Sequence, residues 1–351
     1  MNVQTELPSR PRAWWRFAAH CLLAIVGFGL AAIGIVAATD PYGLRAAPGR
    51  PPGPLMDSNQ RFLYPQIVRG GAYDSAVIGT STARLLDPVD LDRALGGRFA
   101  NLAMNAATPF EQRAMARLFL AHARPRTLLL ALDSTWCEAD ADMRLFTPRP
   151  FPAWLYEEGA WFGPLRQVNW QSLVTGGGVL LHRLGRLPER IRADGYAVFT
   201  PPESHYDATR AAQHIRGGTA IGEADPPPSD RSVSGPMPAL TWLDELLGQA
   251  PAETTKLVAF MPVHVRVQGA AGTARGEREA QCKARVAEIG RARGATVVDF
   301  RIPSPVTTRD ENYWDALHYR LPIAPRIVAG LSAARTKASD DPDGLYRLLA
   351  R

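Results

Sequence analysis

The chain has 351 residues, of which 46% are hydrophobic and 21% are charged. This composition excludes an intrinsically disordered protein and suits one large domain or two smaller ones. The formal charge of +6 comes almost wholly from arginine, because lysine occurs only at positions 256, 283 and 337. The arginines are scattered and form no basic stripe with interleaved aromatic residues, so the sequence indicates no nucleic-acid partner.

The first informative segment is Phe17–Ala38, whose 22 residues carry no charge. At a rise of ~1.5 Å per residue, such a helix reaches ~33 Å and could cross a ~30 Å hydrocarbon core. Arginines precede it, and Trp14 and Trp15 occupy the position of an interfacial aromatic belt. This favours a transmembrane anchor with residues 1–16 in the cytoplasm and the rest of the chain outside. The alternative is a signal peptide cleaved after Val36-Ala37-Ala38, although its apolar run would be unusually long.

Residues 39–70 are expected to form a juxtamembrane linker. Within it, the proline-rich stretch 47–55 has no periodicity and is typical of a semi-rigid spacer that holds the following segment away from the bilayer. Residues 56–70 are compatible with a short helix.

The rest of the chain is organised around the stretch 73–84. Its apolar residues are followed by Gly-Thr-Ser-Thr, which predicts a buried strand near 75–79 that ends in a tight turn. Ser81 would lie in that turn, at the carboxyl end of a strand, where open α/β sheets bind their ligands. The backbone N–H groups of the turn would be available to an oxyanion. Arg84 could face a substrate or cap a nearby carboxylate, and the second arrangement is the more common.

The next two elements are a helix and a strand. Thr108 as N-cap, Pro109 and a capping-box Glu111 predict a helix that continues to about His122. Residues 127–132 form a continuous apolar strand, and Asp-Ser-Thr-Trp follows it.

Residues 137–252 do not alternate cleanly between strand and helix. We expect an insertion or lid over the strand ends here, with a mobile loop at 217–238. The region contains Trp154, Trp161 and Trp170, which could stack on sugar rings, although packing in the core is the more common role of such residues.

Regular alternation returns in the last third of the chain. Helices near 238–249, 276–293 and 322–335 alternate with strands near 257–261 and 296–300. Together with the earlier strands, they predict a parallel sheet with helices on both faces, the architecture of an α/β sandwich.

Asp315 and His318 follow the last predicted strand, three positions apart. His318 could take the proton of Ser81 as it attacks a carbonyl, and Asp315 could orient the imidazole and stabilise its cation. His264, at the end of another strand, could line the same pocket, although an ordinary loop histidine is the more common case.

The chain has three cysteines. Cys21 lies in the apolar segment, which leaves Cys137 and Cys282 to form a single bridge in an oxidising compartment or, as the more common arrangement, two unpaired buried thiols. There is no Cys-x-x-Cys and no His/Cys cluster at metal-ligand spacing, so we expect neither a metal nor a cofactor.

The serine turn and the Asp315/His318 pair resemble the first and last blocks of the SGNH/GDSL hydrolase superfamily. Gly-Thr-Ser in place of Gly-Asp-Ser resembles its membrane-anchored bacterial branch, which includes alginate O-acetyltransferases and D-alanyl transfer proteins. The resemblance implies a parallel-sheet, flavodoxin-like α/β/α sandwich over residues 71–351.

The same resemblance implies an oxyanion hole. Ala106, five positions after Asn101, takes the place of a glycine that lends its backbone N–H, provided that the position needs no positive φ. The third block of the superfamily, Gly-x-Asn-Asp, is absent, so Ser134 or Thr135 would have to replace its asparagine as donor.

The resemblance implies a bacterial inner-membrane, single-pass acyl or acetyl transferase or esterase that acts outside the cytoplasm through Ser81, His318 and Asp315. Its partners would be a cell-envelope polysaccharide or acylated carbohydrate and a membrane acyl-donor protein. The altered third block leaves open a non-catalytic, glycan-binding envelope scaffold. An unrelated α/β protein that binds phosphate at Gly-Thr-Ser-Thr would leave Asp315 and His318 without a role.

Overall fold

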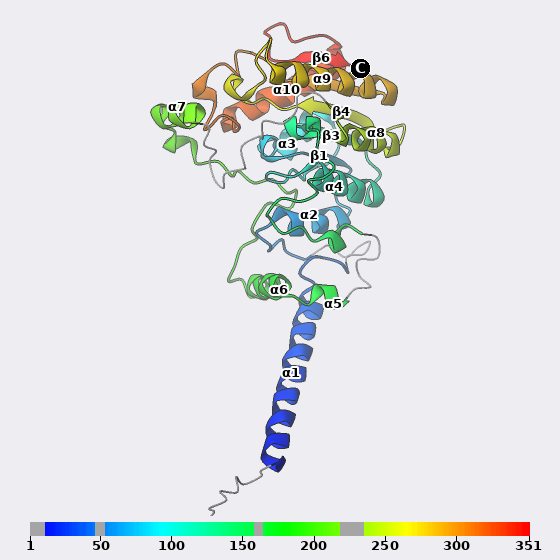
Figure 1. Ribbon diagram of the computed structural model, residues 1–351, viewed down its shortest axis with the longest axis vertical. Coiled ribbons are helices and arrows are strands. Elements are labelled where there is room, and N and C mark those ends of the chain that lie inside the picture. Colours follow the sequence, from blue (N-terminus) through cyan, green and yellow to red (C-terminus); the bar gives the residue numbers. More distant parts are fainter. Residues whose placement is uncertain (1–10, 46–52, 158–163, 218–234) are drawn as a thin grey trace, which may run out of the picture.

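The structure is a computed structural model that describes residues 11–45, 53–157, 164–217 and 235–351. A long N-terminal helix, α1 (Pro11–Thr39), projects from an α/β body (Figure 1). Among the described residues, Trp14–Thr39 is the one helix long and apolar enough to cross a membrane, and very little of it is buried. It contains the expected span 17–38, so the chain is compatible with a single membrane crossing.

The body is built on one sheet of six strands, in the order β2-β1-β3-β4-β5-β6. The strands are β1 (Ser75–Ile78), β2 (Phe99–Asn101), β3 (Thr127–Leu132), β4 (Thr255–Phe260), β5 (Ala295–Asp299) and β6 (Arg347–Ala350). The first five are parallel, and β6 runs antiparallel to β5. The four predicted strands are thereby confirmed as parallel neighbours. The sequence pattern predicted neither β2 nor β6.

Both faces of the sheet are buried. Along β3, Leu128 and Leu130 belong to one hydrophobic core and Leu129 to the other, because successive side chains of a strand point to opposite faces. Every residue of β1 and β3 is buried. Continuous apolar runs of this kind are expected of central parallel strands that helices cover on both sides.

Helices pack on both faces of the sheet. On one face lie α4 (Pro109–His122), α8 (Ala239–Gln249) and α9 (Ala274–Arg293), and on the other lie α3 (Pro88–Leu95) and α10 (Ala324–Lys337). The capping box and the end of α4 are those predicted from the sequence. The architecture is therefore the doubly wound α/β arrangement that the alternation of elements predicted.

The chain between β3 and α8 adds no strand within its described residues. It contains α5 (Pro164–Gln167), α6 (Trp170–Arg183) and α7 (Ala208–Gly217). Most of the loop expected at 217–238 lies outside the described residues, as does Trp161. The helix α8, which the expected insertion included, packs in the core.

The body packs directly against the end of α1. The buried Tyr42 ring contacts Phe62 of α2 (Gln60–Arg69) and also Trp154, at centroid distances of 5.7 and 5.8 Å. Trp154 is therefore a packing residue. Gly176 of α6 is in close contact with Thr39, the last residue of α1. Most of the proline-rich spacer expected at 47–55 lies outside the described residues.

Candidate active site

The loops that follow β1, β3, β4 and β5 meet at one edge of the sheet, because parallel strands all point the same way. They carry Ser81, Ser134, His264 and His318, as predicted. The order of the first five strands reverses between β1 and β3, and this is where doubly wound sheets bind ligands. Ser81 lies immediately beyond this point.

Ser81 opens a short 3₁₀ turn, Ser81–Ala83, two residues after Gly79. A Cβ at Gly79 would lie 2.8 Å from the carbonyl oxygen of Ala131 in β3, so this position requires glycine for the turn to pass the neighbouring strand. Ser81 itself is 8% exposed. The Gly-Thr-Ser pattern therefore reflects a steric need as well as a chemical one.

Ser81, His318 and Asp315 form a continuous hydrogen-bonded chain. His318 Nε2 lies 2.9 Å from Ser81 Oγ, and His318 Nδ1 lies 2.8 Å from Asp315 Oδ2. When Nδ1 carries the ring proton and donates it to the carboxylate, Nε2 is free to accept the serine proton. The structure thus brings together three residues that are up to 237 positions apart.

The loop that carries the acid and the histidine is held by its own backbone. Asp315 Oδ1 accepts hydrogen bonds from the N–H groups of Leu317 and His318, at 2.7 and 2.8 Å. The Trp314 N–H donates to the His318 carbonyl at 2.9 Å. Asp315 is fully buried, so the ion pair that forms when His318 is protonated would be little screened by water.

Phe199 is a residue that the sequence analysis did not identify. Its ring packs edge-on against the His318 ring at a centroid distance of 5.3 Å. The Arg84 guanidinium lies 4.7 Å from the centroid of the same phenyl ring. No local pattern distinguishes Phe199 from other aromatic residues, because it reaches the site only through the tertiary path of the chain.

Among the residues that the structure describes, no carboxylate forms an ion pair with Arg84, in contrast to the more common arrangement considered for it. It is 5% exposed, and its Nη1 donates to Asn105 Oδ1 at 3.0 Å. Burial of a guanidinium is costly unless it is hydrogen-bonded, and Asn105, Tyr64 and the face of Phe199 are among the contacts of Arg84. Arg84 therefore links the serine turn to the turn that contains Ala106.

The sequence left open whether the position of Ala106, in the Asn105–Ala106 turn, needs a positive φ. Ala106 has φ +50°, in the left-handed region that favours glycine. The turn is held by Arg61, whose Nη2 donates to the Asn105 carbonyl at 3.2 Å and forms a fully buried ion pair with Glu111. No hydrogen bond among the described residues uses the N–H of Ala106 or of Ser81. The N–H that the resemblance requires is thus present, but in a strained conformation.

Thr135 cannot replace the missing asparagine donor in the arrangement observed. Its hydroxyl donates to Asp133 Oδ1, and its backbone N–H donates to the same oxygen at 2.9 Å. Ser134 is half-buried in the same 3₁₀ turn, Ser134–Cys137. Burial raises the pKa of Asp133 above its ordinary value, and the hydrogen bonds from Thr135 and Thr80 only partly offset this.

His264 supports the loop of Asp315 and His318 from behind. Its backbone N–H donates to the Ala316 carbonyl at 2.9 Å, and its Nδ1 accepts from the Arg266 N–H at 3.3 Å. Its Nε2 lies 3.1 Å from Asp310 Oδ1. Desolvation lowers the pKa of His264. These contacts are those of an ordinary loop histidine, the case that the sequence analysis favoured.

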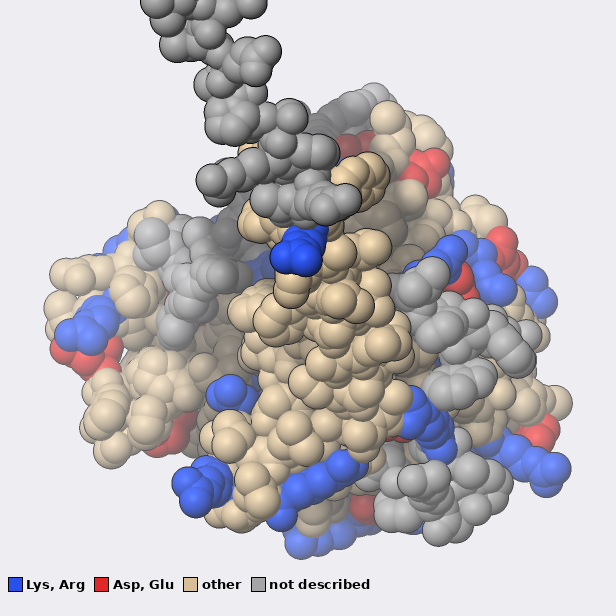
Figure 2. Space-filling model, turned by 90° about the horizontal axis from the view of Figure 1, so that it is seen from below, with Lys and Arg blue, Asp and Glu red and all other residues tan. Residues whose placement is uncertain are grey.

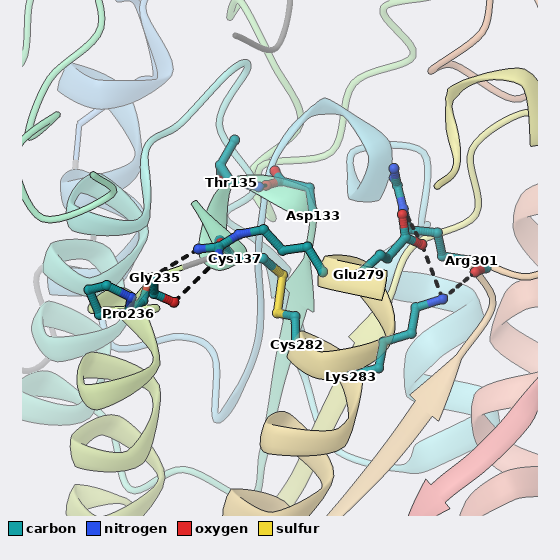
Figure 3. The surroundings of a disulfide bond; sticks show 10 residues. Asp133, Thr135, Cys137, Gly235, Pro236, Glu279, Cys282, Lys283 and Arg301 are labelled. Atoms are coloured by element: carbon teal, nitrogen blue, oxygen red, sulfur yellow. Dashed lines mark hydrogen bonds and ion pairs between the residues drawn. A yellow bond between two sulfur atoms is a disulfide. The ribbon is translucent and has the colours of Figure 1, made fainter. Parts of the chain in front are cut away.

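The turn after β3 is fastened by a disulfide between Cys137 and Cys282 of α9 (Figure 3). Arg278, from the same helix, donates to the Cys137 carbonyl at 2.9 Å. The preference for two unpaired thiols is therefore wrong. The bond closes 145 residues of chain, and no local pattern indicates such a pairing.

Among the described residues, no group of three or more His, Cys, Asp or Glu is arranged to hold a metal ion. A search for known relatives of the chain found no protein-family model, no curated protein and no solved structure that matches it.

Proposed function

We propose that this protein catalyses acyl transfer from an ester through a nucleophilic serine, Ser81, with His318 as general base and Asp315 as its orienting acid. The observation that carries this proposal is the position of the His318 ring, with one nitrogen 2.9 Å from a serine hydroxyl and the other 2.8 Å from a buried carboxylate. A serine hydroxyl is a weak nucleophile at neutral pH and needs such a base.

In the proposed reaction, Ser81 Oγ attacks the ester carbonyl while His318 Nε2 takes the hydroxyl proton. Asp315 stabilises the resulting imidazolium, and the N–H groups of Ser81 and Ala106 stabilise the oxyanion. His318 then gives the proton to the alcohol oxygen as the ester bond breaks. The alcohol departs, and the acyl group stays bound to Ser81 Oγ. Attack by water completes hydrolysis, and attack by a sugar hydroxyl completes transfer.

We propose an ester-bearing cell-envelope polysaccharide as the substrate. Three features support this: the apolar helix α1, a disulfide of the kind formed in oxidising compartments, and the resemblance to membrane-anchored SGNH proteins. The proposed location is the outer face of a bacterial inner membrane, with the N-terminus in the cytoplasm. A membrane acyl-donor protein would be the partner in a transferase reaction.

A second candidate, a non-catalytic envelope scaffold that keeps the fold and binds glycan, is favoured by one observation. The Thr135 hydroxyl is occupied by Asp133, so Thr135 does not supply the missing side-chain donor of the oxyanion hole. Loss of one such donor typically costs ~10²–10³-fold in rate. This slows an enzyme without abolishing its chemistry, which is why we prefer the catalytic alternative.

The test uses the full-length protein in detergent micelles with a fluorophosphonate probe and a p-nitrophenyl ester. The wild type should be labelled at Ser81 and should hydrolyse the ester. Ser81→Ala and His318→Ala should each lose ~10²–10⁴-fold in turnover, and the double variant should be no worse than either, because the residues act as one unit. Asp315→Asn should lose less, since a misplaced imidazole keeps some basicity.

The matched control is Ser339→Ala, which removes an exposed hydroxyl just after α10 and should keep both labelling and turnover. Labelling of a serine other than Ser81, or full turnover by Ser81→Ala, would contradict the catalytic proposal and favour the scaffold.

A further inference from the structure

Helix α6 (Trp170–Arg183) carries an apolar stripe that the body of the protein does not cover. Trp170, Val174, Leu181 and the following residue Leu184 are 78%, 51%, 45% and 70% exposed. Their spacing of four, seven and three residues places them on one face of a helix with 3.6 residues per turn. Exposed apolar side chains so aligned indicate an interaction surface.

The opposite face of α6 explains why this stripe points outward. Ser172, Thr175 and Val179 are buried, and Thr175 donates to the buried Asp57 at 2.9 Å. Gln171 donates to the same carboxylate. The polar and small residues of α6 therefore fix the helix to the body, and its large apolar residues are left on the outside.

The position of α6 identifies what lies beside the stripe. A Cβ at Gly176 would lie 2.8 Å from Thr39 Oγ1 and 3.5 Å from Ile35, so α6 crosses the last turn of α1 at close range. Arg183 Nη1 also donates to the carbonyl of Ala38 at 3.1 Å. Figure 1 shows α6 next to the end of α1, below the rest of the body.

The length of α1 places this contact at the boundary of a bilayer. From Phe17 to Ala38 a helix spans ~33 Å, slightly more than a ~30 Å hydrocarbon core. Ala38 and Thr39, which α6 contacts, therefore fall at the boundary between the core and the headgroups. The exposed apolar surface of α1 includes Ile33 and Ile35, which are 43% and 39% exposed, and it leads directly to α6.

Basic residues lie where anionic headgroups would be. Arg183, Arg186 and Arg190 are exposed within or just after α6. In Figure 2, which views the molecule from the side on which α1 projects, basic side chains flank the uncharged surface. Apolar residues inserted at the interface, with arginines beside them, are the pattern of a helix that lies in the plane of a membrane.

We infer that α6 is an interfacial helix that lies on the outer surface of the bilayer crossed by α1, with Trp170, Val174, Leu181 and Leu184 inserted among the lipids. The inference rests on α1 spanning a membrane and is independent of the chemistry proposed for Ser81. With a second point of contact, the body cannot swing freely about the end of α1.

The test measures lipid contact in the full-length protein, reconstituted in nanodiscs of phosphatidylethanolamine and phosphatidylglycerol. In a Cys21→Ser background, Val174→Cys and Leu181→Cys are labelled with the fluorophore NBD and quenched with a lipid that carries a doxyl group near its headgroup. Thr209→Cys, on the exposed surface of α7, is the matched control. Both α6 labels should emit at shorter wavelength and lose much of their emission to the doxyl lipid, and the α7 label should do neither.

Two results would overturn the inference. Quenching at 174 and 181 no stronger than at 209 would show that the stripe faces water. A shift to shorter wavelength without quenching would show that a second protein copy covers it. A label on native Cys21 tests separately whether α1 lies in the membrane. Quenching at Cys21 without quenching at α6 would show that α1 enters the bilayer and that α6 does not contact it.

Discussion

At the scale of single residues, Ala106 has a left-handed backbone conformation, which residues with a Cβ rarely adopt. The turn it occupies is held from three directions by Arg84, Arg61 and Gln60, and its φ of +50° is imposed by that surrounding structure. Backbone strain of this kind persists where neighbouring contacts over-determine the conformation.

Ala106→Gly should therefore stabilise the folded protein. A left-handed conformation costs an L-residue ~1–2 kcal/mol, and the extra freedom of glycine in the unfolded chain takes back ~0.5–1 kcal/mol. We expect a net gain of ~0.5–1 kcal/mol in the free energy of unfolding, measured by chemical denaturation. Ala338, with φ +55° in an exposed position after α10, is the matched control, and Ala338→Gly should give a similar gain. A loss of stability in both variants would contradict this account.

His264 makes stability depend on pH. Desolvation lowers its pKa, and the nearby Asp310 only partly restores it, so the fold favours the neutral ring. The unfolded chain therefore binds a proton more readily than the folded chain below about pH 6.5, and stability is lost as the pH falls through that value. His264→Gln should lose less stability than the wild type over the same fall in pH, as measured by thermal unfolding. Equal pH dependence in the two proteins would show that His264 is not responsible.

At the scale of elements, the 3₁₀ turn Ser134–Cys137 is fixed to α9 by the disulfide and by the hydrogen bond from Arg278 to the Cys137 carbonyl. Ion pairs join the same helix to the end of β5. Figure 3 shows the disulfide beside Asp133, Thr135 and the charged residues of α9. Lys283 lies 2.9 Å from Asp299 and 3.2 Å from Glu279, and Glu279 pairs with Arg301 at 2.9 Å. The turn that borders the serine site is thus joined to a helix of the opposite half of the chain.

Removal of this bond should destabilise the protein considerably. A disulfide that closes a long loop restricts the unfolded chain, and its loss typically costs ~2–5 kcal/mol. We expect Cys137→Ala combined with Cys282→Ala to lower the free energy of unfolding by that amount in a denaturant titration. Cys21→Ser, which removes the exposed free thiol of α1, should leave stability unchanged. If neither the double variant nor a reductant shifted the transition, the bond would be absent in solution.

At the scale of the whole molecule, the orientation in a membrane depends on a few charges. Arg10, Arg12 and Arg16 precede the apolar run, whereas Arg45 and Arg50 follow it and are partly offset by Asp40. Basic residues are retained on the cytoplasmic side, so this asymmetry supports the proposed orientation, with the body outside. The disulfide is in keeping with that orientation, since such bonds are rare in the cytosol.

Alkaline phosphatase fused after Gln60 should therefore be active, because it needs an oxidising compartment for its own disulfides. A reporter that works only in the cytoplasm should be silent at the same position. The reverse pattern would remove the proposed envelope substrate, although it would leave the geometry of Ser81 and His318 unchanged.

The sequence by itself determined the elements whose signals are local. The apolar runs at β1, β3, β4 and β5 predicted buried parallel strands, because each strand needs only its own residues to show that it is covered on both faces. The same holds for α1, whose length and lack of charge are read within one segment. Ser81, Asp315 and His318 could be identified as candidate site residues because Ser81 lies in a short turn motif and Asp315 and His318 are three positions apart.

Only the tertiary structure decided which distant residues meet. The disulfide, the partner of Arg84 and the contact of Phe199 with His318 all join parts of the chain with no shared local pattern. The short strand β6 could not be predicted, since its pairing with β5 depends on where the last helix ends. The positive φ of Ala106 follows from contacts across the turn, and an alanine in the sequence gives no sign of it. The physical reason is common to all five: the free energy of each feature comes from an interaction between two segments, so it cannot be read from either segment alone.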